Sequence, residues 1–129
     1  MFQEISSAQN VKIKNIVKLR NRRQRDKQQT MIIEGYRSLL RASNNEVKAT
    51  EFYFCRDFFL GENEDELIQK YQENGAQVFE LTKNVFEKIS YRDRPEGLLA
   101  LAPYQSRQLD ELELSEAPFL VVAQAIEKP

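Results

Sequence analysis

The sequence predicts an α/β fold, a three-layer α/β/α sandwich around a small parallel or mixed sheet. Apolar and β-branched residues gather in four short runs, at residues 30–34, 51–55, 77–81 and 98–102. Continuous apolar runs of this length are typical of strands that are buried on both faces. Helical periodicity separates the runs, so helices are expected on both faces of the sheet. At 129 residues, the chain has the length of one domain and can fold without a disulfide or a metal.

Residues 6–27 are predicted to form the first helix, because Ser6 or Ser7 can accept hydrogen bonds from its first backbone N–H groups. An apolar face on one side of this helix would pack against the sheet. That face consists of Val11, Ile13, Ile16, Val17 and Leu19.

The same helix has a basic side. Lys14, Lys18, Arg22 and Arg25 follow one another at spacings of four, four and three residues, which places them along one side of a helix. Residues 1–41 carry ten Lys and Arg against three acids, whereas the rest of the chain carries nine against seventeen. Such asymmetry indicates an anionic partner, and a stripe of cations attracts nucleic-acid phosphates. The alternative is a helix face that is merely solvated.

The remaining helices follow from capping and turn signals. Gly35 ends the first strand and precedes a short helix, which Asn44-Asn45 ends. Asn63, with Glu66 three residues later, predicts a capping box at the start of the next helix. That helix ends at Asn74-Gly75, where glycine suits a helix terminus.

The last helix is predicted to begin at Thr82, because threonine is a favoured cap. Pro95-Glu96-Gly97 then predicts a tight turn, since proline presets one backbone dihedral angle and glycine permits a positive one. The final strand follows this turn and ends at Pro103.

Composition excludes several kinds of site. The chain has no histidine and its one cysteine is Cys55, so we expect no metal site and no internal disulfide. No apolar run approaches the roughly 18 residues that span a membrane. A single unpaired thiol favours a cytoplasmic location. Glycine-rich phosphate loops and a glycine-flanked nucleophilic serine are also missing, so we expect no catalytic residue.

Tyr91-Arg92-Asp93-Arg94 forms a second basic and aromatic segment, in a loop. An aromatic ring beside guanidinium groups can stack on or clamp a nucleotide. The alternative is an ordinary polar loop in which arginine pairs with aspartate.

Composition changes again toward the C-terminal end. Residues 104–117 are rich in acids and amides and predict an acidic linker, whereas Phe119–Ile126 predicts a strand with no partner strand after it. We therefore expect a folded domain at 1–103, the linker at 104–117 and, at 118–129, the first strand of a second, truncated domain.

Several segments, taken together in order and spacing, resemble the SpoU (TrmH) family of RNA ribose methyltransferases. They are the opening Ser7-Ala8-Gln9-Asn10 with the basic residues up to Arg25, the strand-to-helix segment Ile32-Ile33-Glu34-Gly35-x-Arg37, and the turn and strand Arg94-Pro95-Glu96-Gly97-Leu98-Leu99-Ala100. The ending, Phe119 to Pro129, resembles the strand that opens the knotted catalytic domain of that family.

The resemblance implies the N-terminal substrate-binding domain of an S-adenosylmethionine-dependent rRNA or tRNA ribose 2′-O-methyltransferase, with a ribosomal-protein-like fold. It implies structured RNA as the partner. For the full-length protein it also implies S-adenosylmethionine as cofactor and a homodimer formed through the knotted domain. The catalytic arginine and the cofactor loops of the family would lie beyond Pro129, so this chain alone is expected to bind RNA without a cofactor and without catalysis.

The resemblance also assigns residues. Glu34 and Gly35 match a family motif and are expected to be structural. Glu96 replaces the more usual glutamine of the family, and its carboxylate would repel phosphate. The candidate RNA contacts are Lys14, Lys18, Arg22, Arg23, Arg25, Arg37, Arg92 and Arg94.

Two other functions compete with this interpretation. One is a complete RNA-binding protein of the ribosomal type. The other is a protein-interaction domain in which Phe119–Ile126 is the partner-binding strand, since an apolar strand without neighbours tends to pair with another chain.

Overall fold

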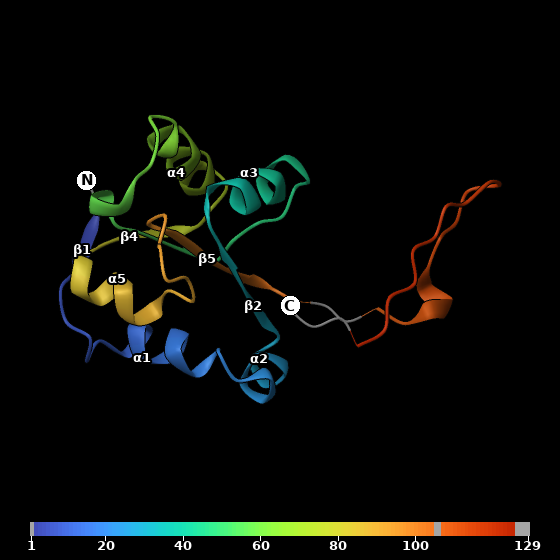
Figure 1. Ribbon diagram of the computed structural model, residues 1–129, viewed down its shortest axis with the longest axis horizontal. Helices are drawn as coiled ribbons and strands as arrows, with labels where there is room; N and C mark the ends of the chain where they lie inside the picture. Colours follow the sequence, from blue (N-terminus) through green and yellow to red (C-terminus); the bar gives the residue numbers. More distant parts are fainter. Residues whose placement is uncertain (1, 105–106, 126–129) are drawn as a thin grey trace.

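The computed structural model describes residues 2–104 and 107–125 (Figure 1). The elements run in the order β1 (Gln3–Ile5), α1 (Val11–Lys18), α2 (Arg22–Gln28), β2 (Thr30–Glu34), α3 (Tyr36–Asn44), β3 (Glu51–Phe54), α4 (Glu64–Glu73), β4 (Gln77–Leu81), α5 (Lys83–Ile89) and β5 (Leu98–Pro103). Short 3₁₀ turns lie at Arg56–Phe58 and Leu109–Glu111. All four predicted strands are present.

The sheet has five strands in the order β1-β4-β3-β5-β2. Strands β1, β4 and β3 run parallel to one another, whereas β5 is antiparallel to both β3 and β2. The sheet is therefore mixed, and β2 is one of its two edges. Helices α3 and α4 cover one face and α1 and α5 cover the other (Figure 1). This arrangement confirms the predicted α/β/α sandwich.

Burial on both faces explains why the strands read as continuous apolar runs. In β3, Tyr53 packs into the core beneath α1 and α5, while Phe52 and Phe54 pack into the core beneath α3 and α4. The same alternation divides β5, where Leu99 and Leu98 enter opposite cores. A strand that alternates between two apolar cores has no polar face to interrupt its pattern.

The predicted helix 6–27 is wrong as a single helix. Its N-cap is Asn10, whose side chain accepts a hydrogen bond from the Lys12 backbone N–H, and not Ser6 or Ser7. The helix ends after Lys18, and the Asn21 side chain caps a second helix by accepting from the Arg23 backbone N–H at 2.8 Å. Such a cap satisfies a backbone N–H group that has no partner within the second helix and so favours a helix start at this position.

Two other local predictions need correction. Strand β1 was not predicted, because three residues with only Ile5 buried are too short to show a period. Helix α4 does have Asn63 as its N-cap, but the capping box is not formed. The Glu64 carboxylate instead accepts a hydrogen bond from the Gly61 backbone N–H at 2.8 Å.

The strand predicted at Phe119–Ile126 is not formed in its described residues, 119–125; Ile126 lies outside the described part of the chain. Residues 107–125 are exposed throughout, with Phe119 at 90% and Val122 at 92%. A strand needs a neighbour to take its backbone hydrogen bonds, and none of the described residues lies beside this segment (Figure 1). The division at residues 103 and 117 stays a prediction. No helix in the described residues is long and apolar enough to cross a membrane.

Gly97 fixes the turn that leads into β5. Its φ is +78°, and a Cβ placed there would overlap the Cys55 carbonyl oxygen. The Gly97 carbonyl accepts from the Cys55 backbone N–H at 2.9 Å, so this close approach joins the turn to the end of β3. Only glycine satisfies both requirements.

We expect Gly97→Ala to lower the free energy of unfolding by about 3 kcal/mol or more, because positive-φ strain adds to a backbone overlap. Gly75→Ala is the matched control: its φ is +100°, yet nothing lies within 4 Å of its added Cβ. It should cost only about 1–2 kcal/mol. Urea unfolding of both variants measures the difference, and equal losses would contradict the packing assigned to Gly97.

Candidate nucleic-acid interface

The loop between α5 and β5 is fastened to the junction of β2 and α3 by Glu34. The Glu34 carboxylate accepts hydrogen bonds from the Ser90 hydroxyl and, at 3.0 Å, from the Tyr91 backbone N–H. The Arg92 guanidinium donates to the Glu34 carbonyl oxygen at 3.0 Å. Glu34 therefore has the structural role that the sequence predicted for it.

Gly35 and Glu96 complete this junction. Gly35 has a φ of +97°, and a Cβ there would lie 2.6 Å from both Arg92 Nη2 and Glu96 Oε2. Glu96 forms an ion pair with Arg92 inside the turn. Its carboxylate thus compensates a guanidinium within the loop, which gives a physical reason for glutamate at this position.

Arg25 closes the end of α1. Its guanidinium donates from Nη1 to the carbonyl oxygens of Leu19 and Arg20, at 2.9 and 2.7 Å. Carbonyl groups at a helix C-terminus have no partner within the helix, and a cation there is favourable. Arg25 therefore holds α1 and α2 together, a role that the sequence pattern did not indicate.

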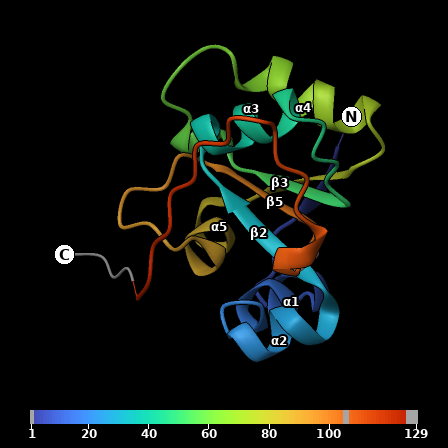
Figure 2. The same ribbon diagram turned by 90° about the vertical axis from the view of Figure 1, so that its right-hand side faces the viewer.

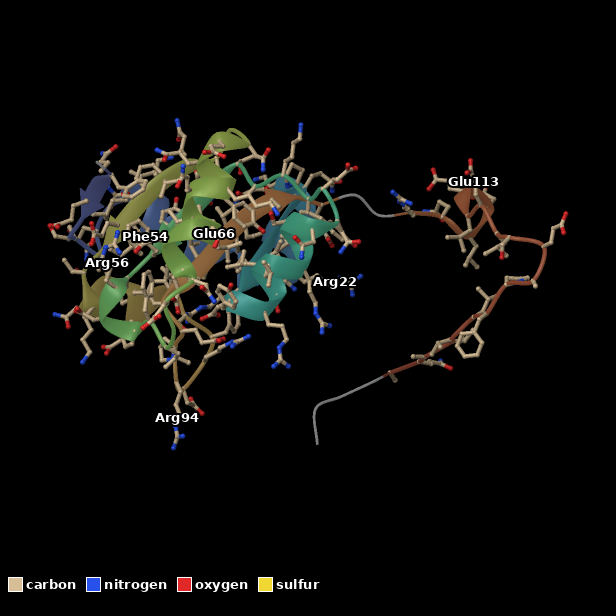
Figure 3. All side chains as sticks on the ribbon, turned by 90° about the horizontal axis from the view of Figure 1, so that it is seen from above. Arg22, Phe54, Arg56, Glu66, Arg94 and Glu113 are labelled. Carbon is tan, nitrogen blue, oxygen red and sulfur yellow. The ribbon has the colours of Figure 1, made fainter. Side chains whose placement is uncertain are left out.

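The other predicted contacts are exposed. Lys14 and Lys18 lie on α1, Arg23 on α2, Arg37 near the start of α3 and Arg94 in the α5–β5 loop. Within residues 2–104 and 107–125, these five side chains make no ion pair or hydrogen bond. Arg22 is also exposed, and its Nε forms an ion pair with Asp26 Oδ2 at 3.7 Å. Figure 3 shows Arg22 and Arg94 projecting outward from separate parts of the domain.

The predicted single stripe is divided by the break between the two helices. Lys14 and Lys18 remain on α1, whereas Arg22 and Arg25 lie on α2. Three of the predicted arginines, Arg22, Arg25 and Arg92, instead line hollows beside β2, at one edge of the sheet. Figure 2 shows β2 and α2 on the side of the domain that faces the viewer. The other five predicted residues, Lys14, Lys18, Arg23, Arg37 and Arg94, do not line these hollows.

Two adjoining hollows follow that edge. The larger, about 380 Å³, is lined by Arg25, Met31, Ile32, Glu34, Tyr91 and Arg92. The smaller, about 240 Å³, is lined by Arg22, Arg25, Asp26, Thr30, Met31 and Tyr104. Arg25 and Met31 line both hollows, so the two lie next to each other along β2.

Arg20 is a residue at this surface that sequence reasoning missed. Its guanidinium donates to the carbonyl oxygens of Lys88 and, at 3.1 Å, Ser90. It also lies 5.0 Å from the centre of the Tyr91 ring, a cation–π distance. These contacts join residues about 70 positions apart, so no local spacing signals them.

The surface contains acids and bases in structural roles but no reactive thiol. Burial raises the pKa of the Cys55 thiol, which keeps the group protonated and unreactive. No grouping of three or more His, Cys, Asp or Glu suited to a metal ion occurs in the described part of the chain. The chemistry this edge offers is that of fixed guanidinium groups beside an aromatic ring.

These observations define the class of the domain: an α/β/α sandwich whose sheet edge carries positioned cations. A family model described as the MRM3-like substrate binding domain matches residues 10–100, and the chain belongs to this family. The match runs from the residue before α1 into β5, and so includes β2 and the α5–β5 loop.

Solved structures share the fold. An RNA 2′-O ribose methyltransferase is 32% identical over 98% of this chain and 47% of its own, with a TM-score of 0.74. An AdoMet-bound rRNA methyltransferase from Sinorhizobium meliloti is 20% identical over 89% of this chain and 41% of its own, with a TM-score of 0.75. The SpoU methyltransferase AviRb from Streptomyces viridochromogenes is 16% identical over 83% of this chain and 38% of its own, with a TM-score of 0.66.

The chain spans less than half the length of these structures. No curated protein sequence matches it significantly.

We expect Arg25→Met to lower the free energy of unfolding by about 1–2 kcal/mol, because two carbonyl groups at the end of α1 lose a charged donor. Arg23→Met on the same helix removes an exposed charge that has no partner among the described residues, and it should change stability by less than about 0.5 kcal/mol. Thermal or urea unfolding compares the two. An Arg25→Met protein as stable as Arg23→Met would show that Arg25 does not hold the helices together.

Proposed function

We propose that this chain is the RNA-binding, substrate-recognition domain of an S-adenosylmethionine-dependent methyltransferase that modifies a ribose 2′-hydroxyl of rRNA or tRNA. The family match supports a substrate-binding role. The printed names of the similar structures, an RNA 2′-O ribose methyltransferase and an AdoMet-bound rRNA methyltransferase, support the reaction and the cofactor.

The observation that carries RNA binding is the distribution of charge. Exposed cations lie on α1, α2, α3 and the α5–β5 loop, while Glu34 and Glu96 near the β2 edge are occupied by hydrogen bonds or an ion pair within the domain. Cations without local partners attract phosphate, and the release of counterions drives binding. RNA is the anionic partner that the family context favours.

The proposal places S-adenosylmethionine outside the described residues, and the surroundings of two glycines support this. The close backbone approach to a nucleoside group that glycine allows is unavailable at Gly35 and Gly97, because side chains and a carbonyl already fill the space beside them. We place the cofactor site and the catalytic residues in another part of the full-length protein. The chain alone then binds RNA and transfers no methyl group.

The remaining features of the full-length protein belong to the same proposal. These are a homodimer formed outside this domain, a cytoplasmic location, and a linker at 104–117 that leads to a catalytic domain beginning at 118. The exposed apolar residues Phe119 to Val122 support this division, because such a segment is stable only when another sheet covers it.

We expect the Lys14→Glu/Lys18→Glu variant to bind a structured ribosomal RNA fragment at least tenfold more weakly than the wild-type chain at low salt. Two phosphate contacts are replaced by repulsion, and the salt dependence of the binding constant becomes shallower. Fluorescence anisotropy of labelled RNA at two salt concentrations measures both quantities.

Lys48→Glu/Lys70→Glu is the control, because it changes the net charge equally at two lysines outside α1 and α2. This variant should bind within about threefold of wild type. Equal losses of RNA affinity in both variants would indicate nonspecific attraction. Wild-type binding that does not weaken as the salt concentration rises would contradict the proposal. Methyl transfer from S-adenosylmethionine by the purified chain would contradict its lack of catalysis.

A further inference from the structure

We propose that the larger hollow beside β2 is a subsite for one unpaired nucleotide of the bound RNA, with the base stacked on Tyr91 and its phosphate held by Arg25 and Arg92. The inference rests on the proposed RNA-binding function and adds what that function leaves open. It states where on the surface an individual nucleotide is recognised.

The Tyr91 ring is placed as a stacking platform. Tyr91 is 56% exposed although it lines the hollow, and the Arg20 guanidinium lies 5.0 Å from the centre of its ring. Arg20 is itself held by the carbonyl groups of Lys88 and Ser90. The Tyr91 backbone is fixed by its hydrogen bond to Glu34. An exposed aromatic ring with so many fixed supports loses little entropy when a base stacks on it.

The two guanidinium groups of the hollow retain unused donors. Arg25 uses only Nη1 at the end of α1, and Arg92 uses Nη1 and Nη2 for Glu96 and the Glu34 carbonyl. In the described chain, Arg25 Nε and Nη2 and Arg92 Nε have no partner. Donors on prepositioned arginines suit the oxygens of a phosphate.

The acid in the hollow does not oppose this assignment. Both oxygens of the Glu34 carboxylate already accept hydrogen bonds, from Ser90 and Tyr91. Arg25, Arg92 and Glu34 line the hollow, and Glu96 pairs with Arg92, so the charges of these four groups balance and a phosphate would be held by the unused guanidinium donors. Asp93 makes no ion pair with the neighbouring arginines in the described residues, since Arg92 pairs with Glu96. The simple arginine–aspartate loop is therefore not what the structure shows.

The geometry selects an unpaired base. Within a duplex, each base is covered on both faces by its neighbours, so a ring in the wall of a hollow can stack only on a base that leaves the helix. The hollow is open to solvent and has a volume of about 380 Å³, which leaves room for a base beside the ring. A loop or bulge nucleotide is the matching element of structured RNA.

A Tyr91→Trp variant tests the subsite directly, because the chain contains no tryptophan and the introduced indole becomes its only one. We expect an RNA hairpin with an unpaired loop to quench the fluorescence of this indole, and a fully paired duplex of equal length to bind with little quenching. Leu60→Trp is the control, since Leu60 is exposed and does not line the hollow. Its fluorescence should respond equally and weakly to both RNAs.

Affinity provides the second readout. Tyr91→Ala should weaken hairpin binding on the order of tenfold and leave duplex binding unchanged, because stacking contributes about 1–3 kcal/mol per base. Tyr91→Phe, which keeps the ring, should bind the hairpin like wild type, and thermal unfolding checks that all variants are folded.

The outcomes separate the two proposals. If the wild-type chain binds neither RNA, the proposed function fails. If both RNAs bind but quench the Tyr91→Trp variant equally, or if Tyr91→Ala binds the hairpin like wild type, RNA binding stands and the nucleotide subsite is wrong.

Discussion

The junction at Glu34 is the constraint on which the rest of this surface depends. The Glu34 carboxylate, at the end of the edge strand, accepts hydrogen bonds from the Ser90 hydroxyl and the Tyr91 backbone N–H. The Glu34 backbone carbonyl accepts a hydrogen bond from the Arg92 guanidinium. The loop leaving α5 is thereby fixed on β2 before the chain enters β5. At its other end, Gly97 lies against the Cys55 carbonyl and aligns β5 beside β3. A loop fastened at both ends presents its arginines and its aromatic ring in one defined arrangement.

The cations of the domain therefore belong to two physical classes. Arg20, Arg25 and Arg92 are held by backbone carbonyl groups, so their positions are set before any ligand arrives. Lys14 and Lys18 extend into solvent. Exposed surface cations provide long-range, salt-sensitive attraction. Guanidinium groups that are already fixed lose little entropy when they bind a ligand in a defined geometry. A domain that recognises structured RNA benefits from both.

Local patterns predicted most of the architecture. The four apolar runs correspond to β2 to β5, because strands buried on two faces leave an unmistakable sequence pattern. Strand β1 was missed because only Ile5 of its three residues is buried. The sequence does not predict the helix break at Leu19–Asn21, because the helical periodicity of residues 6–27 continues across it, although Asn21 caps a new helix.

The candidate site was predicted less completely than the fold. The basic residues and the motif around Gly35 are visible in the sequence, and Glu34 was correctly expected to be structural. The roles of Arg20 and Arg25 depend on which carbonyl groups the folded chain leaves unpaired beside them. No sequence spacing encodes that information, because it arises from the packing of the folded chain around each guanidinium group.

The most direct measurement is an NMR titration of the isotope-labelled chain with a structured ribosomal RNA fragment, followed through backbone amide shifts. If helix α1 and the β2 edge of the sheet together form the RNA-binding surface, the largest shifts will occur in α1, α2, β2 and the loop at residues 90–97, while α4 and β1 remain unchanged. Shifts centred on α4 or β1, or no shifts at all, would contradict the assignment of RNA binding to this surface.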